Sequence, residues 1–190
     1  MDEHEPWVGG EYQNGLCGFR VALVGWSHWG DEDDEDFGTR VCIEKVISRE
    51  WRIRFFTQIR NYCGYSDHAL FWPKVMFLNY LPNLVGGAEE RFGHGTEEQR
   101  EAAKLRFRRL VEAHAPQKVL VFTSRRWALP EMAWRRELDP PFSKFLKCGF
   151  ETARGAVDVY CLRHPQGAKG EVMRQVVDHV LRAPLSIREL

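Results

Sequence analysis

The sequence predicts an α/β protein in which helices cover both faces of a parallel sheet. Short apolar runs recur along the chain and stop at glycine, proline or polar residues, which is typical of strands buried on both faces. Stretches with the apolar spacing of helices lie between these runs. This alternation is the pattern of parallel sheets with right-handed crossovers. We therefore expect three layers, α/β/α, with a four-stranded parallel sheet in the middle.

Four apolar runs are the predicted strands, near residues 20–25, 75–79, 118–123 and 157–163. The first run stops at Gly25, and polar and aromatic side chains follow it as far as Asp31. Ligands of open α/β sheets bind beyond the carboxyl ends of the strands. Residues 26–31 are therefore expected to line a crevice.

Five stretches predict helices, at residues 40–48, 51–62, 96–114, 140–146 and 171–181. Thr96 and Gln99 have the spacing of a capping box, and Pro116 stops the third helix. The fourth stretch starts at a proline pair, which suits a first helical turn. Arg106, Arg108 and Arg109 are expected to form the solvent face of the third helix. The aromatic residues expected in the core are Trp51, Phe55, Phe56, Phe71 and Trp72.

Length and charge limit the classes of protein that this chain fits. Its 190 residues suit one domain, with residues 1–19 as an irregular N-terminal segment. Basic and acidic residues number 27 each, so no net charge draws the chain to nucleic acid or membranes. It lacks a secretion signal and a long apolar span, so we expect a cytoplasmic protein with no membrane contact.

Neither a metal nor a cofactor is expected. The five cysteines include no Cys-x-x-Cys pair, which favours reduced thiols over disulfides or a zinc site. The acidic run at residues 31–36 lacks the spacing of a calcium loop. A divalent cation held by residues 27–31 together with His164 is the alternative.

Three predicted strands end in motifs that together suggest a family. Gly25-Trp26-Ser27-His28-Trp29 follows the first strand, Asn79-Tyr80 the second, and Arg163-His164-Pro165-Gln166-Gly167 the last. Together with the apolar run at residues 119–124, these motifs resemble those of the uracil-DNA glycosylase superfamily, and they occur in the same order along the chain. The opening Gly-x-Ser-His-Trp-Gly-Asp before an acidic stretch is similar to an uncharacterised bacterial or phage-associated branch of that superfamily. The resemblance implies the strand order 2-1-3-4.

The resemblance also implies an activity, the excision of uracil or a modified base from DNA by hydrolysis of the N-glycosidic bond, as in DNA repair. Asn79 would pair with the edge of the base, and His164 would donate a hydrogen bond to the charge that develops on it. The other base-binding candidates are Gly25, Trp26, Trp29 and Phe37. The candidate DNA contacts are Arg125, Arg126, Arg163, Gln166 and Lys169.

Two features support an alternative function. Most active relatives place Asp, Glu or Asn where this chain has Ser27, and a serine hydroxyl is a poor general base without a partner. His28 and Asp31 are the substitutes for that role. The acidic loop 31–36 would repel DNA phosphates, unless it is simply a solvated loop. The alternative is a catalytically inactive member that binds a nucleobase, a nucleotide or a protein partner in the same crevice, a protein partner binding through loop 31–36.

Overall fold

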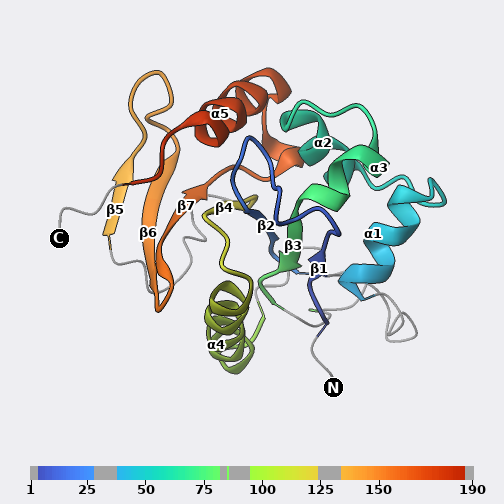
Figure 1. Cartoon of the computed structure of the whole chain (residues 1–190), viewed down its shortest axis with the longest axis horizontal. Coiled ribbons are helices and arrows are strands. Elements are labelled where there is room, and N and C mark those ends of the chain that lie inside the picture. Colours follow the sequence, from blue (N-terminus) through green and yellow to red (C-terminus); the bar gives the residue numbers. More distant parts are fainter. Residues whose placement is uncertain (1–3, 28–37, 82–84, 86–94, 124–133, 187–190) are drawn as a thin grey trace.

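The computed structural model describes residues 4–27, 38–81, 85, 95–123 and 134–186. The strands are β1 (Trp7–Val8), β2 (Val21–Gly25), β3 (Met76–Asn79), β4 (Lys118–Val121), β5 (Trp134–Glu137), β6 (Leu146–Thr152) and β7 (Gly155–Cys161). The helices are α1 (Thr39–Ile47), α2 (Arg54–Tyr62), α3 (His68–Phe71), α4 (Glu97–His114) and α5 (Gly170–Arg182), with short 3-10 helices η2 (Trp72–Lys74) and η4 (Pro165–Gly167). Figure 1 shows α4 on one side of the sheet and α2, α3 and α5 on the other.

The four predicted strands form the centre of the sheet. They are β2, β3, β4 and β7, and they lie side by side and parallel in the order β3-β2-β4-β7. The prediction of a four-stranded parallel sheet is nevertheless wrong. In the described part of the chain the sheet has seven strands, because β1 pairs antiparallel with β3 and the antiparallel strands β6 and β5 follow β7. The protein is therefore a mixed α/β protein with a mixed sheet.

Two predictions of local structure are wrong as well. The segment at residues 140–146 forms no helix; Phe142 and Phe145 close two turns, and the chain enters β6 at Leu146. The N-terminal segment is not wholly irregular, since Trp7–Val8 pairs with β3. The indole of Trp7 also donates a hydrogen bond to the carbonyl of Trp72, at 2.9 Å, which fixes β1 on the edge of the sheet.

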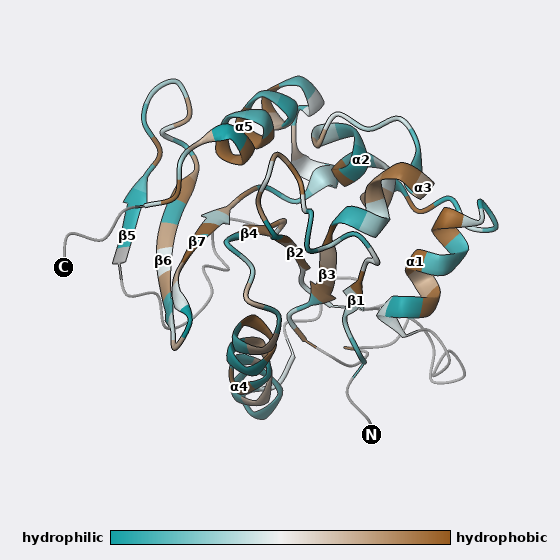
Figure 2. Ribbon diagram, in the orientation of Figure 1, coloured by the Kyte–Doolittle hydropathy of each residue, from teal (hydrophilic) through white to brown (hydrophobic). Residues whose placement is uncertain are grey.

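Each face of the sheet has its own apolar core. Beneath α1, α2 and α5 lie alternate residues of the strands, including Leu23, Phe77, Leu120 and Tyr160. Their chain neighbours face α4 and form the second core. Figure 2 shows the central strands as the most hydrophobic part of the ribbon. Of the aromatic residues expected in the core, Phe56, Phe71 and Trp72 are buried, whereas Trp51 and Phe55 are only partly buried.

Helix α4 begins where the sequence predicts, but one residue predicted on its exposed face is buried. Thr96 and Gln99 form the capping box. Arg108 and Arg109 are exposed, but Arg106 is buried, which corrects its predicted position. Its guanidinium donates hydrogen bonds to the backbone carbonyls of Asn79 and His4. The charged group is tolerated inside the protein because its hydrogen bonds replace those lost with water.

A buried charge cluster joins the sheet to the end of α5. Asp158 lies 2.9 Å from the ammonium of Lys147, and both side chains are buried. Lys118 is the register partner of Asp158 and donates hydrogen bonds to the carbonyls of Val180, Leu181 and Ala183. Asp158 also accepts a hydrogen bond from the backbone N–H of Ser186, at 3.1 Å. The cluster, defined as Lys118, Lys147 and Asp158, therefore holds the C-terminal end of α5 on the sheet.

Acidification is expected to destabilise the fold through His68. Burial, followed by the charge of Arg60, lowers the pKa of His68 from 6.5 to about 4. Its Nδ1 accepts a hydrogen bond from the Trp72 indole, at 2.9 Å, which requires the neutral ring. Between pH 6.5 and 4 the unfolded chain therefore binds a proton that the folded protein does not. We expect this to remove about 1–2 kcal/mol of stability as the pH falls, allowing for solvent screening.

Urea unfolding at pH 7 and at pH 4.5 measures this loss, with His68→Gln as the comparison. Glutamine has an acceptor oxygen but does not titrate. The variant should lose less stability than the parent protein between the two pH values. Equal losses would show that His68 does not contribute to the pH dependence.

Candidate functional site

The carboxyl ends of β2, β3 and β7 place Gly25, Asn79 and His164 at one edge of the sheet. Gly25 and Asn79 are register partners in adjacent parallel strands. Asn79 lies two residues beyond Phe77, whose side chain belongs to the core beneath α2 and α5, and so it points to the same face. The ring of Phe55, on α2, lies 6.1 Å from the ring of Phe77 and 5.2 Å from that of His164. The ring of Phe55 thus lies beside both the end of β3 and the segment that follows β7.

Gly25 leaves room for the Asn79 amide. A Cβ atom at residue 25 would lie 2.2 Å from Asn79 Oδ1 and 3.3 Å from the Phe77 ring, so no other residue fits without displacing the amide. From the opposite face of the sheet, the guanidinium of Arg106 donates to the Asn79 carbonyl at 3.0 Å. The position of Asn79 is therefore fixed on both sides of the strand.

Asn79 is 6% exposed, and its side chain has no hydrogen-bond partner among the described residues. The amide atoms are not fully enclosed, so they can exchange hydrogen bonds with water or with a bound group. A nearly buried amide that is open on one side and bonded to no other described residue marks a candidate binding position. The amide offers both a donor and an acceptor there.

His164 is held as a neutral hydrogen-bond donor. Its Nδ1 accepts a hydrogen bond from the backbone N–H of Gln166, at 3.3 Å, as the N-cap of η4. In the neutral ring the proton is then on Nε2. Burial lowers the pKa of His164, which favours this uncharged form near pH 7. The free donor of the ring is therefore Nε2–H.

Trp26 does not lie with Asn79 and His164. Its ring stacks on Tyr80, with centroids 5.5 Å apart, and packs against the core on the α4 side of the sheet. Because successive residues of a strand face opposite sides, Trp26 and Gly25 diverge. Phe55 is the aromatic neighbour that the structure gives to His164 instead, although the sequence predicted only a core role for it.

The surface beside His164 is basic. Arg163, Gln166 and Lys169 are exposed around the histidine, and Arg52 and Arg54 are exposed where α2 begins, next to Phe55. None of these four charged side chains forms an ion pair with a described residue. Phosphates or carboxylates would be attracted to this side of the edge.

Ser27 follows β2 and is half-buried. The remaining candidates, His28, Trp29, Asp31, Phe37, Arg125 and Arg126, lie outside the described residues, as does the acidic loop 31–36. Two cavities lined by described residues lie away from Asn79 and His164, one near Arg20 and Arg154 and one beside α5.

Comparison with known proteins finds no family model that matches the chain and no matching curated relative. No helix in the described residues has the length and apolar character to cross a membrane. Within the same residues, no three His, Cys, Asp or Glu side chains are placed to hold a metal ion. Fold and site together define a mixed α/β protein with a buried amide and a neutral imidazole at the carboxyl edge of its parallel strands.

Proposed function

We propose that this protein binds a uracil-type base between Asn79 and His164 and excises it from DNA, with a fold of the uracil-DNA glycosylase type. The observation that carries the proposal is the Asn79 amide, nearly buried, fixed by Gly25 and Arg106, and without a partner among the described residues. The order β3-β2-β4-β7 of the central strands supports the proposed fold, because the resemblance implies the same order.

The two side chains suit the chemistry of glycosidic cleavage. The Asn79 amide has one donor and one acceptor at a fixed spacing, which match the edge of a uracil ring. As the bond to the sugar breaks, negative charge develops on the base. The Nε2–H of His164 is a neutral donor for the base oxygen that bears this charge. A preorganised donor of this kind contributes about 3 kcal/mol to the transition state.

The exposed cations favour a DNA strand as the source of the base. Arg163 and Lys169 flank His164, and Arg52 and Arg54 extend the basic surface along the start of α2. Neutralised phosphates supply most of the sequence-independent affinity for DNA. This basic surface would set the path of the strand that carries the extruded base.

Ser27 favours the second candidate function, a protein that binds a nucleobase or nucleotide without hydrolysing a bond. Among the described residues the Ser27 hydroxyl has no hydrogen-bond partner that would make it a base. A serine in that condition does not activate water efficiently. In this candidate the same amide and imidazole bind the ligand, and the bond to the sugar stays intact.

A cleavage assay separates the two functions. Single- and double-stranded oligonucleotides that carry uracil are incubated with the parent protein and with Asn79→Ala and His164→Ala, and abasic sites are counted on a gel. Excision should fall about 100-fold or more in both variants. The matched controls are Asn61→Ala and His179→Ala, which remove an exposed asparagine and an exposed histidine elsewhere.

Binding of free uracil, followed through the backbone amide resonances of Gly25 and Asn79, completes the test. Binding without excision from any substrate would establish the second function. If the parent protein neither excises nor binds uracil, or if the controls lose as much as the two site variants, the proposal is wrong.

A further inference from the structure

A polar cavity of about 340 Å³ lies at the opposite edge of the sheet from Asn79 and His164. Its walls come from the residues that precede β2 and β4, from the C-terminal end of α4 and from the turn between β6 and β7. The volume is within the range of sites for small molecules. The cavity belongs to the described part of the chain and is separate from the proposed base site.

Arg20 projects a fixed guanidinium into this cavity. Its Nε donates to the carbonyl of Ala115, at 2.8 Å, and its backbone N–H donates to the side-chain oxygen of Gln117, at 3.0 Å. Its two terminal nitrogens have no acceptor among the described residues. The guanidinium is thus oriented by its Nε–H, while its four terminal N–H donors remain available.

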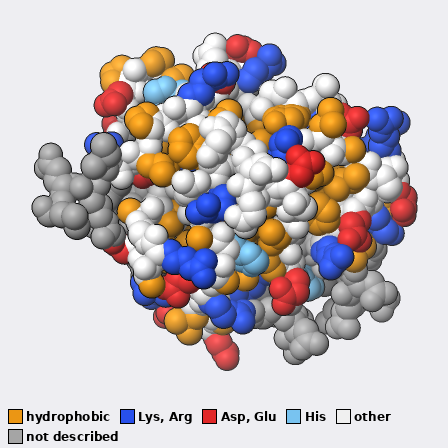
Figure 3. Space-filling view, viewed as in Figure 1, with side chains coloured by type: hydrophobic (Ala, Val, Ile, Leu, Met, Phe, Trp, Pro, Cys, Tyr) orange, Lys and Arg blue, Asp and Glu red, His pale blue; other side chains and the backbone are white. Residues whose placement is uncertain are grey.

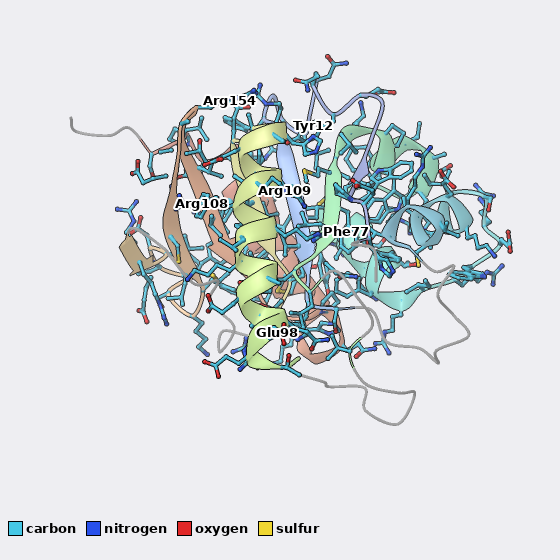
Figure 4. The ribbon with its side chains drawn as sticks, turned by 90° about the horizontal axis from the view of Figure 1, so that it is seen from below. Tyr12, Phe77, Glu98, Arg108, Arg109 and Arg154 are labelled. Carbon is cyan, nitrogen blue, oxygen red and sulfur yellow. The ribbon has the colours of Figure 1, made fainter. Side chains whose placement is uncertain are left out.

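Arg154 reaches the cavity from a rigid turn. The hydroxyl of Thr152 donates to the Gly155 carbonyl, at 2.7 Å, and accepts from the backbone N–H of Arg154, at 3.1 Å. Gly155 has φ 114°, a conformation that favours glycine. Figure 4 shows Arg154 at the same end of α4 as Tyr12. The Arg154 guanidinium has no ion pair among the described residues.

The charges of the cavity lining have one sign. Two guanidinium groups line it, and no Asp or Glu does. The other lining residues are neutral, including His114, because burial lowers the pKa of its imidazole. Two kinds of negative group lie nearby. The carboxylate of Glu5 is close enough to His114 to act on its pKa. The last carbonyls of α4 are also near, and those of His114 and Ala115 accept hydrogen bonds from Tyr12 and Arg20. Figure 3 shows Lys and Arg side chains over the region of α4 on this face, with some Asp and Glu side chains among them. An anion in the cavity would therefore meet two cations and no carboxylate in the lining itself.

We infer that this cavity is a binding site for a small anion that carries a phosphoryl or carboxylate group. Guanidinium groups bind both through paired N–H donors, and two of them without counter-ions in one cavity form a preformed receptor. The cavity has space for a ligand of several heavy atoms, beyond a single ion. The site does not depend on the proposed base excision.

Calorimetric titration with pyrophosphate and with citrate tests this site, because the two probes present the two chemistries. Saturable binding of either one is expected at millimolar concentrations, and the tighter probe identifies the class of ligand. Arg154→Gln should weaken binding about tenfold, since it removes a charge-assisted contact from an exposed side chain. Arg20→Gln should do the same. Arg174→Gln, on α5, removes the same charge far from the cavity and should have no effect.

Backbone amide resonances locate the bound probe. The resonances of Gly155 and Ala156 should move, while those of Gly25 and Asn79 at the base site should not. The inference is overturned by three results: no saturation with either probe, binding that survives Arg154→Gln and Arg20→Gln unchanged, or shifts confined to the base site.

Discussion

Replacing Asp158 with alanine is expected to lower the free energy of unfolding by about 3–5 kcal/mol. The carboxylate is 3% exposed and lies 2.9 Å from the ammonium of Lys147, which is itself buried. It is also the register partner of Lys118, another fully buried lysine. Alanine would leave two buried cations without a counter-charge, and taking an unpaired charge out of water is costly. The Ser186 N–H would lose its acceptor as well.

The effect is measured by urea unfolding at pH 7, with Asp178→Ala as the control. Asp178 forms an exposed ion pair with Arg182, one turn along α5, and such pairs contribute less than about 1 kcal/mol. The double replacement Asp158→Leu with Lys147→Met should recover part of the loss, because it removes both charges of the pair. If Asp158→Ala lowers the free energy of unfolding no more than Asp178→Ala does, the buried lysines do not need the Asp158 carboxylate as a counter-charge.

Gly25→Ala is expected to abolish base binding at the proposed site while the protein remains folded. The added Cβ would lie 2.2 Å from Asn79 Oδ1, so the amide must move away. Displacement of a positioning group by about 1 Å costs on the order of 100-fold in rate. We therefore expect a loss of excision, or of uracil affinity for the non-hydrolytic function, comparable to that of Asn79→Ala.

The control for this substitution is Gly10→Ala, because a Cβ at residue 10 meets no atom within 4 Å. Thermal unfolding of both variants separates loss of function from loss of fold. Full activity in folded Gly25→Ala would show that the Asn79 amide does not act from the position observed here.

The sequence alone predicts the central strands of the sheet but not the strands at its edges. β2, β3 and β4 contain continuous apolar runs, and four apolar residues in a row follow Asp158 of β7, at 159–162. Such runs signal burial on both faces without any knowledge of neighbours. β6 is buried too, but Lys147 interrupts its apolar run. That lysine is tolerated only because Asp158 lies beside it in space, a contact that the local sequence does not reveal.

The same limit applies to the candidate site. The sequence predicts that Gly25 and Asn79 lie close together, because each ends a strand and neighbouring parallel strands end at the same edge of a sheet. Phe55 and Arg106 do not, because each reaches the site from a helix, and only the way these helices pack on the sheet brings them there. The arginine spacing on α4 suggested a solvent face, which is right for Arg108 and Arg109 and wrong for Arg106.

Two hydrogen bonds of the Arg106 guanidinium link the N-terminal segment to the candidate site. One guanidinium bridges the carbonyl of Asn79 and that of His4, which are remote in sequence. Displacement of the N-terminal residues would therefore remove one of the two acceptors that hold the Arg106 guanidinium against the strand end that presents the amide. Recombinant protein for the assays is better extended at the other terminus, where no such linkage to Asn79 is found among the described residues.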